Sequence, residues 1–368
     1  MDALQYLNTS LPWTERIWKQ LSQAESPATS SLFFGKQGLG KAQTALRYIV
    51  DLLSENDVFL AANHPDVHVI MPANKVQELV DVSTLEGDIL KTEFSCELLL
   101  AVYAQRYLEK STAKPKKIIS VQQIRSLIEQ ITQHAHLAKN KIIVIKDADK
   151  MNINASNALL KTLEEPPENT IFILLADQIE SLPITIRSRC TEVHFRSPDK
   201  SIGLQWLEQQ GLTNHAESYL MMAGRAPLAA LRLSQNNEIE YLRTIFSAIN
   251  KLWAQKISSI ELASEWKKHD FSFINKSLQQ FMHDLLKLKS VEGSADNSIM
   301  SGELFYPVQS EWSKKISRTV QIESLFHMIE VLQTLDKQSS SPVDKQLLLE
   351  KTTIQLEKLA LNKHILVS

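Results

Sequence analysis

The fold of this chain is decided by residues 141–195, which read KIIVIKDADKMNINASNALLKTLEEPPENTIFILLADQIESLPITIRSRCTEVHF. Branched apolar residues fill positions 142–145 and an apolar run follows at 171–175, and both segments predict strands buried on two faces. A third strand is expected over 193–195. Because a helical pattern connects the first two strands, this stretch predicts a parallel sheet flanked by helices.

The segments between these strands place polar residues at the ends of the elements. The intervening helix is predicted to be capped by Asn154 and to end at Pro166-Pro167, since proline cannot continue a helix. After Pro183 a helical turn is expected to carry Arg189 outward before the third strand. Arg189 is therefore expected at the end of an element.

A glycine-rich loop earlier in the chain has the features of a phosphate-binding P-loop. The segment GKQGLGKA follows a short buried strand and opens a predicted helix. Glycines let backbone N–H groups turn toward phosphate, and the helix N-terminus adds favourable partial charge. The residues expected to bind nucleotide phosphate are Gly35, Gly38, Gly40 and Lys41. Ala42 stands where serine or threonine belongs in such a loop.

Two motifs in the decisive stretch resemble the AAA+ clamp-loader family. They are NALLKTLEEPP at 157–167 and IRSRC at 186–190, and the resemblance covers about residues 10–235. In that family the arginine of Ser-Arg-Cys reaches the nucleotide of the adjacent subunit. The resemblance therefore implies that Arg189 is a catalytic arginine finger that acts in trans on a neighbouring ATPase subunit.

The resemblance also implies a domain organisation. An α/β AAA+ P-loop domain, with a parallel sheet and flanking helices, is expected over residues 1–197, with an insertion of unknown role at about 73–116. A small helical lid domain is expected at 198–240. An all-α collar domain, which holds the subunits of such a ring together, is expected at 241–368, where amphipathic spacing recurs.

The positions that handle a metal ion in an active ATPase are altered in this chain. Ala42 offers no hydroxyl oxygen to magnesium. The Asp-Glu pair that active relatives carry at a strand end is replaced by Lys146 and Asp147, and a lysine there would repel the metal. Lys146 and Asp149 are expected to lie at a solvated strand end. We therefore expect no intrinsic ATP hydrolysis.

Nucleotide binding itself stays open at this point. Lys41 and the backbone of the loop could still hold ATP or ADP without hydrolysis, so no cofactor is certain. Pro227 stands where active relatives carry an arginine that senses the γ-phosphate, although Arg225 is nearby.

Composition limits the other functions. The 368 residues are 43% hydrophobic and 22% charged with a formal net charge of −2, so DNA contact would need a local patch or partners. No run approaches the roughly 20 apolar residues that span a bilayer, and no cationic region precedes an apolar one at the N-terminus, so a cytoplasmic protein is expected. Cys96 and Cys190 are the only cysteines, so neither zinc nor another metal site is expected.

Altered metal positions together with an intact finger resemble a non-hydrolysing subunit of the bacterial DNA polymerase III clamp loader. The resemblance implies a hetero-oligomeric ring with gamma or tau ATPase subunits and a delta subunit, which assembles the sliding clamp on primed DNA. The alternatives are a working ATPase of the gamma/tau type and a clamp-binding module of the delta type. Ala42 and Lys146 argue against the first, and the P-loop with Ser-Arg-Cys argues against the second.

Overall fold

A computed structural model describes residues 11–53, 64–82, 100–101, 104–108, 117–132, 138–236, 238–291, 310–339 and 344–361 of the chain. Contacts divide the chain into two compact units. The first unit comprises Met1–Trp206 with Ala226–Ala229, and the second comprises Leu207–Arg225 with Ala230–Ser368. The finer division into three domains stays a prediction.

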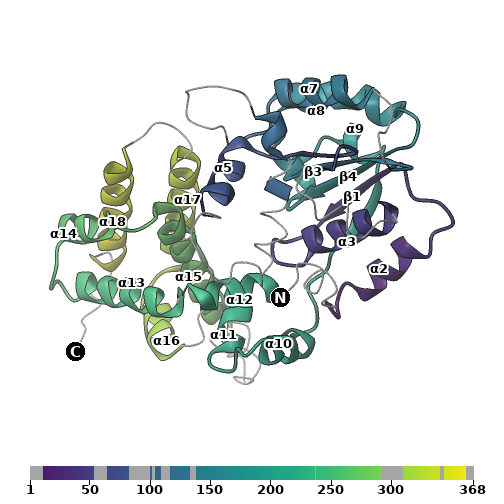
Figure 1. Ribbon diagram of the computed structural model, residues 1–368. Coiled ribbons are helices and arrows are strands. Elements are labelled where there is room, and N and C mark those ends of the chain that lie inside the picture. Colours follow the sequence, from purple (N-terminus) through teal and green to yellow (C-terminus); the bar gives the residue numbers. More distant parts are fainter. Residues whose placement is uncertain are drawn as a thin grey trace. The chain divides into compact units, whose positions relative to one another are not determined.

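The first unit is built on a five-stranded sheet in which every neighbouring pair of strands is parallel (Figure 1). The strands lie in the order β2-β3-β4-β1-β5. Their bounds are β1 (Ser30–Phe34), β2 (Val67–Ile70), β3 (Lys141–Lys146), β4 (Thr170–Ala176) and β5 (Thr191–His194). The predicted α/β class with a parallel sheet is confirmed.

Helices cover both faces of this sheet, with α7, α8 and α9 on one side and α3 on the other (Figure 1). On the first side, Leu127 and Leu159 from the helices form one core cluster with Ile143 and Phe172 from the sheet. The helices of this unit are α2 (Glu15–Ser22), α3 (Lys41–Leu53), α5 (Ala73–Val82), α7 (Val121–Ile131), α8 (Ile153–Glu164) and α9 (Ile184–Arg187).

The helix of the decisive stretch, α8, begins earlier than the sequence suggested. Its N-cap is Asn152, whose Oδ1 accepts a hydrogen bond of 2.8 Å from the backbone N–H of Ala155. Asn154, the expected cap, lies inside the first turn. The prediction was wrong by two positions. Either Asn152 or Asn154 can act as an N-cap, and the distance in sequence to the apolar stripe does not show which of the two does so. The helix ends at Glu164, before Pro166-Pro167 as predicted.

The segment expected as an insertion, 73–116, lies only partly within the described residues. Its first part is α5, and a 3₁₀ turn covers Gln105–Tyr107. The side chain of Tyr107 is buried, and its hydroxyl donates a hydrogen bond of 2.9 Å to Oε1 of Gln130. The described parts of this segment therefore pack against the sheet unit.

Every element of the second unit that the described residues cover is a helix, as the sequence predicted. The helices are α10 (Lys200–Gln209) and α12 (Pro227–Gln235), whose residues are divided between the units, and α11 (Ala216–Met222), α13 (Glu238–Trp253), α14 (Ser259–Trp266), α15 (Phe271–Val291), α16 (Ser310–Thr319), α17 (Ile322–Ser339) and α18 (Lys345–Leu361). Helix α15 packs against α16 and α17, and α14 packs against α18. Within the described ranges, no helix has the length and hydropathy needed to cross a membrane.

Candidate functional site

The glycine-rich loop connects the end of β1 to the first residue of α3, so the predicted strand, loop and helix follow one another. Gly35, Gly38 and Gly40 have φ angles of 143°, 85° and 86°, which residues with a side chain rarely adopt. Space also restricts the loop. A Cβ atom added to Gly35 would lie 2.3 Å from the carbonyl oxygen of Phe195. The loop thus has the backbone form of a P-loop.

Two neighbouring segments cover this loop. The backbone N–H of Leu228, in the first turn of α12, donates to the carbonyl of Gly38 at 3.2 Å. The indole N–H of Trp13 donates to the carbonyl of Leu39 at 3.0 Å, and its ring meets that of Trp206 edge to face. Pro227 begins α12 and therefore lies beside the loop.

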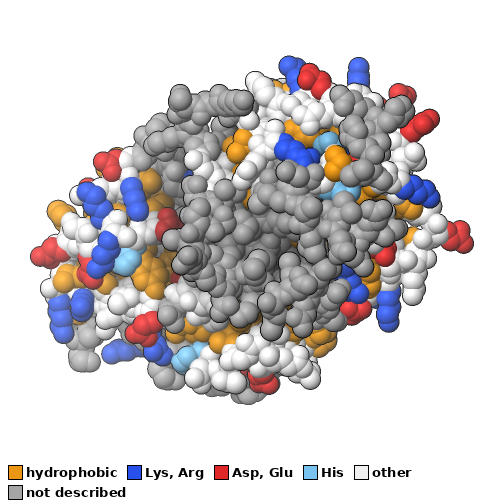
Figure 2. All heavy atoms as spheres, in the orientation of Figure 1, with side chains coloured by type: hydrophobic (Ala, Val, Ile, Leu, Met, Phe, Trp, Pro, Cys, Tyr) orange, Lys and Arg blue, Asp and Glu red, His pale blue; other side chains and the backbone are white. Residues whose placement is uncertain are grey.

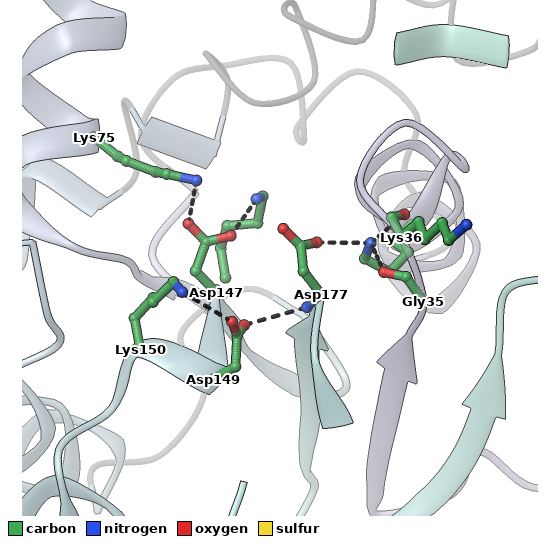
Figure 3. A network of polar contacts seen from close by, with 9 residues as sticks. Gly35, Lys36, Lys75, Asp147, Asp149, Lys150 and Asp177 are labelled. Atoms are coloured by element: carbon green, nitrogen blue, oxygen red, sulfur yellow. Dashed lines mark hydrogen bonds and ion pairs between the residues drawn. The ribbon is translucent and has the colours of Figure 1, made fainter. Parts of the chain in front are cut away.

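Lys41 points back into its own loop. Its Nζ donates to the carbonyl oxygens of Gly35 at 2.6 Å and Lys36 at 2.9 Å, and it pairs with Oδ1 of Asp177 at 2.9 Å (Figure 3). Asp177 follows the last residue of β4, and its backbone N–H donates to Oδ1 of Asp149 at 3.2 Å. Three neighbouring strands thus contribute to one polar network at the carboxyl edge of the sheet.

The end of β3 differs from the solvated strand end that the sequence suggested. Lys146, Asp147 and Asp149 are all buried. Nζ of Lys146 lies 2.6 Å from Oδ1 of Asp147, and Nζ of Lys75 lies 2.7 Å from Oδ2 of the same carboxylate. The expectation of solvation was wrong because β3 lies inside the sheet, between β2 and β4, so its end is covered.

The two lysines determine the charge state of Asp147. Burial by itself raises the pKa of this carboxyl, but Lys146 and Lys75 outweigh that effect and hold the pKa at about 2. Asp147 is therefore ionised at neutral pH, and a buried carboxylate needs such partners to remain charged. Its backbone is in the left-handed region at φ 57°, which aspartate tolerates better than most residues.

These contacts decide whether the residues fit a magnesium ion. Ala42 has no oxygen to offer, and each oxygen of Asp147 already faces an ammonium group. Asp149 is engaged by the N–H of Asp177 and by Lys150, whose Nζ lies 3.5 Å from Oδ2. The donor set therefore does not fit the magnesium site of an active P-loop ATPase.

One pocket brings three of the expected site residues together, Lys41, Lys146 and Asp147. It is lined by Gln37, Lys41, Ala42, Lys146, Asp147, Leu175 and Asp177. Arg189 is not one of the described residues that line this pocket. The structure therefore separates the expected finger from the chain's own P-loop pocket.

Arg189 lies in the turn between α9 and β5, at the end of an element as predicted. Its Nη2 pairs with Oε1 of Glu164, the last residue of α8. Its Nη1 donates to the carbonyl of Thr185 at 2.8 Å and to Oγ of Ser188 at 3.3 Å. The side chain is 32% exposed, so the guanidinium lies at the surface but is tied to its own chain.

Cys190, the residue after Arg189, is half-buried. Burial, with a smaller contribution from the charge of Glu192, raises the pKa of its thiol to about 11. The thiol is therefore protonated at neutral pH, and a protonated thiol is a poor nucleophile. Packing is the role that these observations support.

Two residues of this network were missed by sequence reasoning. Asp177 lies two positions after the apolar run at 171–175, and a polar residue at that strand end was a signal. Lys75 gave no such signal, because it reaches Asp147 from α5, far away in the sequence. Only the fold brings that lysine to the end of β3.

Residues 12–199, just over half of the chain, match the protein family described as DNA polymerase III, delta subunit. DNA polymerase III subunit delta′ of Pseudomonas aeruginosa is 29% identical over 258 residues, which are 69% of this chain and 70% of that protein. The subunit of the same name from Haemophilus influenzae is 34% identical over 200 residues, 53% of this chain and 60% of the relative. A DNA polymerase III gamma subunit-related protein from Thermotoga maritima, of known structure, is 15% identical with a TM-score of 0.45, covering 95% of this chain and 99% of that one.

Proposed function

The chain belongs to the DNA polymerase III delta subunit family, as a subunit of the delta-prime type, and on that premise we propose that it supports clamp loading without hydrolysing ATP itself. Its role is to complete the ATP site of a neighbouring gamma or tau subunit with Arg189. A delta subunit, the sliding clamp and primed DNA are the further partners of the proposed ring.

The observation that supports the loss of hydrolysis most directly is the pairing of Asp147 with two lysines. In an active site this strand end holds magnesium, which neutralises charge on the β- and γ-phosphates. Here Lys146 and Lys75 lie at 2.6 Å and 2.7 Å from the two carboxylate oxygens. A magnesium ion would have to displace a buried ammonium group and would still lack the hydroxyl that Ala42 has lost.

The proposed action in trans rests on the position of Arg189. Phosphoryl transfer develops negative charge that a guanidinium stabilises. Arg189 lies at the surface, after α9, while the residues of the chain's own P-loop line a separate pocket. An arginine in such a turn can serve a nucleotide bound to another subunit.

Contact with DNA is proposed to occur through the assembled complex. The face drawn in Figure 2 has Lys and Arg side chains interspersed with Asp and Glu over the described surface. The formal net charge of the chain is −2. Neither feature favours strong phosphate binding by the isolated chain, because such binding depends on concentrated positive charge.

We propose that the chain does not require zinc. In the described part of the chain, no three His, Cys, Asp or Glu side chains are grouped to hold a metal ion. Cys96 lies outside that part, and a tetrahedral thiolate site needs more cysteines than the two in the sequence. Metal analysis of the purified chain tests this, and one zinc per chain would contradict it.

The test of the function is the ATP turnover of a reconstituted complex with clamp and primed DNA. Arg189→Ala is expected to lower turnover at one neighbouring site by roughly 10³–10⁵-fold, the usual contribution of an arginine finger. Total turnover falls only in part if other sites in the ring have their own fingers. Clamp loading falls with it, while size-exclusion chromatography still shows the assembled ring.

The matched control is Arg187→Ala. Arg187 lies two positions earlier and pairs with Glu192, with 3.1 Å between Nε and Oε1. The Arg187→Ala variant removes the same charge beside the same turn but keeps Arg189. It is therefore expected to leave turnover unchanged. If the assembled Arg189→Ala complex loads clamps at the wild-type rate, the finger proposal is wrong. If the isolated chain shows turnover that depends on Lys41, the gamma/tau type is the better assignment.

A further inference from the structure

The ammonium group of Lys41 has no hydrogen-bonding capacity left for a phosphate. An ammonium group has three donors, and here three oxygens of the protein lie within hydrogen-bonding distance. They are the carbonyl oxygens of Gly35 and Lys36 and Oδ1 of Asp177, at 2.6 Å, 2.9 Å and 2.9 Å (Figure 3). The lysine side chain is only 8% exposed. In a working P-loop this lysine reaches the β- and γ-phosphates instead.

Asp177 is the acceptor that does not belong to the loop. It comes from the end of β4, the strand next to β1 in the sheet. Its backbone N–H is bound by the carboxylate of Asp149, whose side chain is 1% exposed and is paired with Lys150. The backbone that presents the Asp177 carboxylate to Lys41 is therefore anchored to buried structure.

We propose that the carboxylate of Asp177 occupies the phosphate position of the P-loop and keeps nucleoside diphosphates and triphosphates out of this subunit. It supplies Lys41 with the negative charge that a phosphate would otherwise bring. An entering phosphate tail must break this ion pair, and it then lies beside the carboxylate that it displaced. The negative charges of the phosphate and of the Asp177 carboxylate would then be close together, and their repulsion is strong where they are partly shielded from water.

The rest of the loop remains suited to an anion. The three loop glycines keep positive φ angles, and the N-terminus of α3 contributes its favourable partial charge. Gln37 and Asp177, at the mouth of the pocket beside Lys41, are partly exposed to solvent. Removal of one negative charge is therefore expected to favour phosphate binding at this loop. This inference goes beyond the proposed function, because the finger of the chain acts on a neighbour's nucleotide whether or not its own site is filled.

The test is calorimetric titration of the isolated full-length chain with ADP, with adenosine as a second ligand. Asp177→Asn keeps the size of the side chain and removes its charge. This variant is expected to bind ADP at least roughly tenfold more tightly than the wild type, since both an ion pair and a repulsion are removed. Its affinity for adenosine, which has no phosphate, is expected to stay unchanged. Lys41→Ala added to the variant is expected to abolish the gain.

The matched control is Glu180→Gln. Glu180 is an exposed carboxylate in the turn after Asp177, and its replacement leaves the contacts of Lys41 unchanged. It is expected to bind ADP like the wild type. Asp177→Ser repeats the test with a smaller side chain in case the asparagine variant does not fold. The proposal is overturned if folded variants at Asp177 bind ADP no more tightly than the control, or if the gain survives the loss of Lys41. Because no partner subunit is present, either outcome leaves the proposed function to its own test.

Discussion

The carboxylate of Glu164 holds the guanidinium of Arg189, and so joins the end of α8 to the turn that precedes β5. Both N–H groups of Nη1 are also used, by the carbonyl of Thr185 and by Oγ of Ser188. In a bidentate contact, a guanidinium donates two parallel N–H groups to the oxygens of a phosphate. These contacts use three of the five N–H groups, and Nε has no partner but is buried. Arg189 must therefore leave this position before two parallel N–H groups can face a phosphate.

The strength of this restraint is measurable. Both side chains are about a third or more exposed, Arg189 at 32% and Glu164 at 45%, so solvent screens their attraction. A double-mutant cycle with Glu164→Gln and Arg189→Gln is expected to give a coupling of about 0.2–1 kcal/mol in urea unfolding. The same cycle with Glu165→Gln is expected to give no coupling. A coupling well above this range would mean that the arginine is fixed in its own chain and is unsuited to act on a neighbour.

The pairing of Asp147 predicts a loss of stability in acid. The pKa of this carboxyl is about 2 in the folded chain, below its ordinary value of 3.8. Its contribution is therefore present above pH 3.8 and is lost as the pH falls toward about 2, and it amounts to about 2 kcal/mol. Asp147→Asn is expected to lose correspondingly less stability between about pH 5 and pH 2 than the wild type. Asp199→Asn, at an exposed site, is the control and is expected to follow the wild type.

Lys75 provides a separate check on the same carboxyl. It is the more exposed of the two lysines, with 34% of its side chain accessible. Lys75→Met is expected to raise the pKa of Asp147, because one of its two stabilising charges is removed. Titration of the Asp147 carboxyl by NMR measures this change directly. An unchanged pKa would show that Lys146 alone keeps the carboxyl ionised.

The loop glycines predict two stability losses of different size. Gly38 and Gly40 have nearly equal φ angles, 85° and 86°. A Cβ at Gly40 would meet the end of the Leu11 side chain, whereas a Cβ at Gly38 would lie 2.6 Å from the backbone nitrogen of Ala229. Gly40→Ala is expected to cost roughly 1–2 kcal/mol from the backbone alone.

Gly38→Ala is expected to cost at least about 1 kcal/mol more, because the first turn of α12 must move away from the loop. Urea unfolding of both variants, followed at the transition of the sheet unit, measures the difference. Equal losses would show that α12 yields without resistance at this contact.

Restoring one metal ligand is expected to leave the chain without hydrolysis. Ala42→Ser supplies the hydroxyl oxygen that a P-loop gives to magnesium. Both oxygens of Asp147 nevertheless stay paired with lysines. Magnesium-dependent turnover of the variant should therefore equal that of a Lys41→Ala control. Turnover above this control would mean that Asp147 can exchange a lysine for the metal.

The sequence predicted the sheet and the loop well because their signals are local. The apolar runs at 142–145 and 171–175 have no stable position except inside a sheet, and each lies in a central strand. The glycine spacing of the loop is likewise a property of one short segment. Helix starts were less certain, as the shift from Asn154 to Asn152 shows, because neighbouring polar residues can serve as the same cap.

The candidate site was predicted only in part because its decisive contacts join distant segments. A lysine after an apolar strand usually indicates exposure, and the sequence does not show that β3 lies between β2 and β4 or that α5 brings a lysine to its end. Lys75, which pairs with Asp147, belongs to none of the motifs recognised in the sequence. The pairing of Lys41 with Asp177 depends in the same way on β1 and β4 being neighbours in the sheet.

Trp13 gives the loop an intrinsic optical reporter. Its indole N–H is bound to the carbonyl of Leu39, and its ring is in contact with Trp206. Indole emission depends on hydrogen bonding and on nearby rings, so a change in the loop backbone alters the fluorescence of this residue. The chain contains six tryptophans, and a version that keeps only Trp13 would isolate the signal. Loop opening in any variant can then be followed in real time without a dye attached to the site.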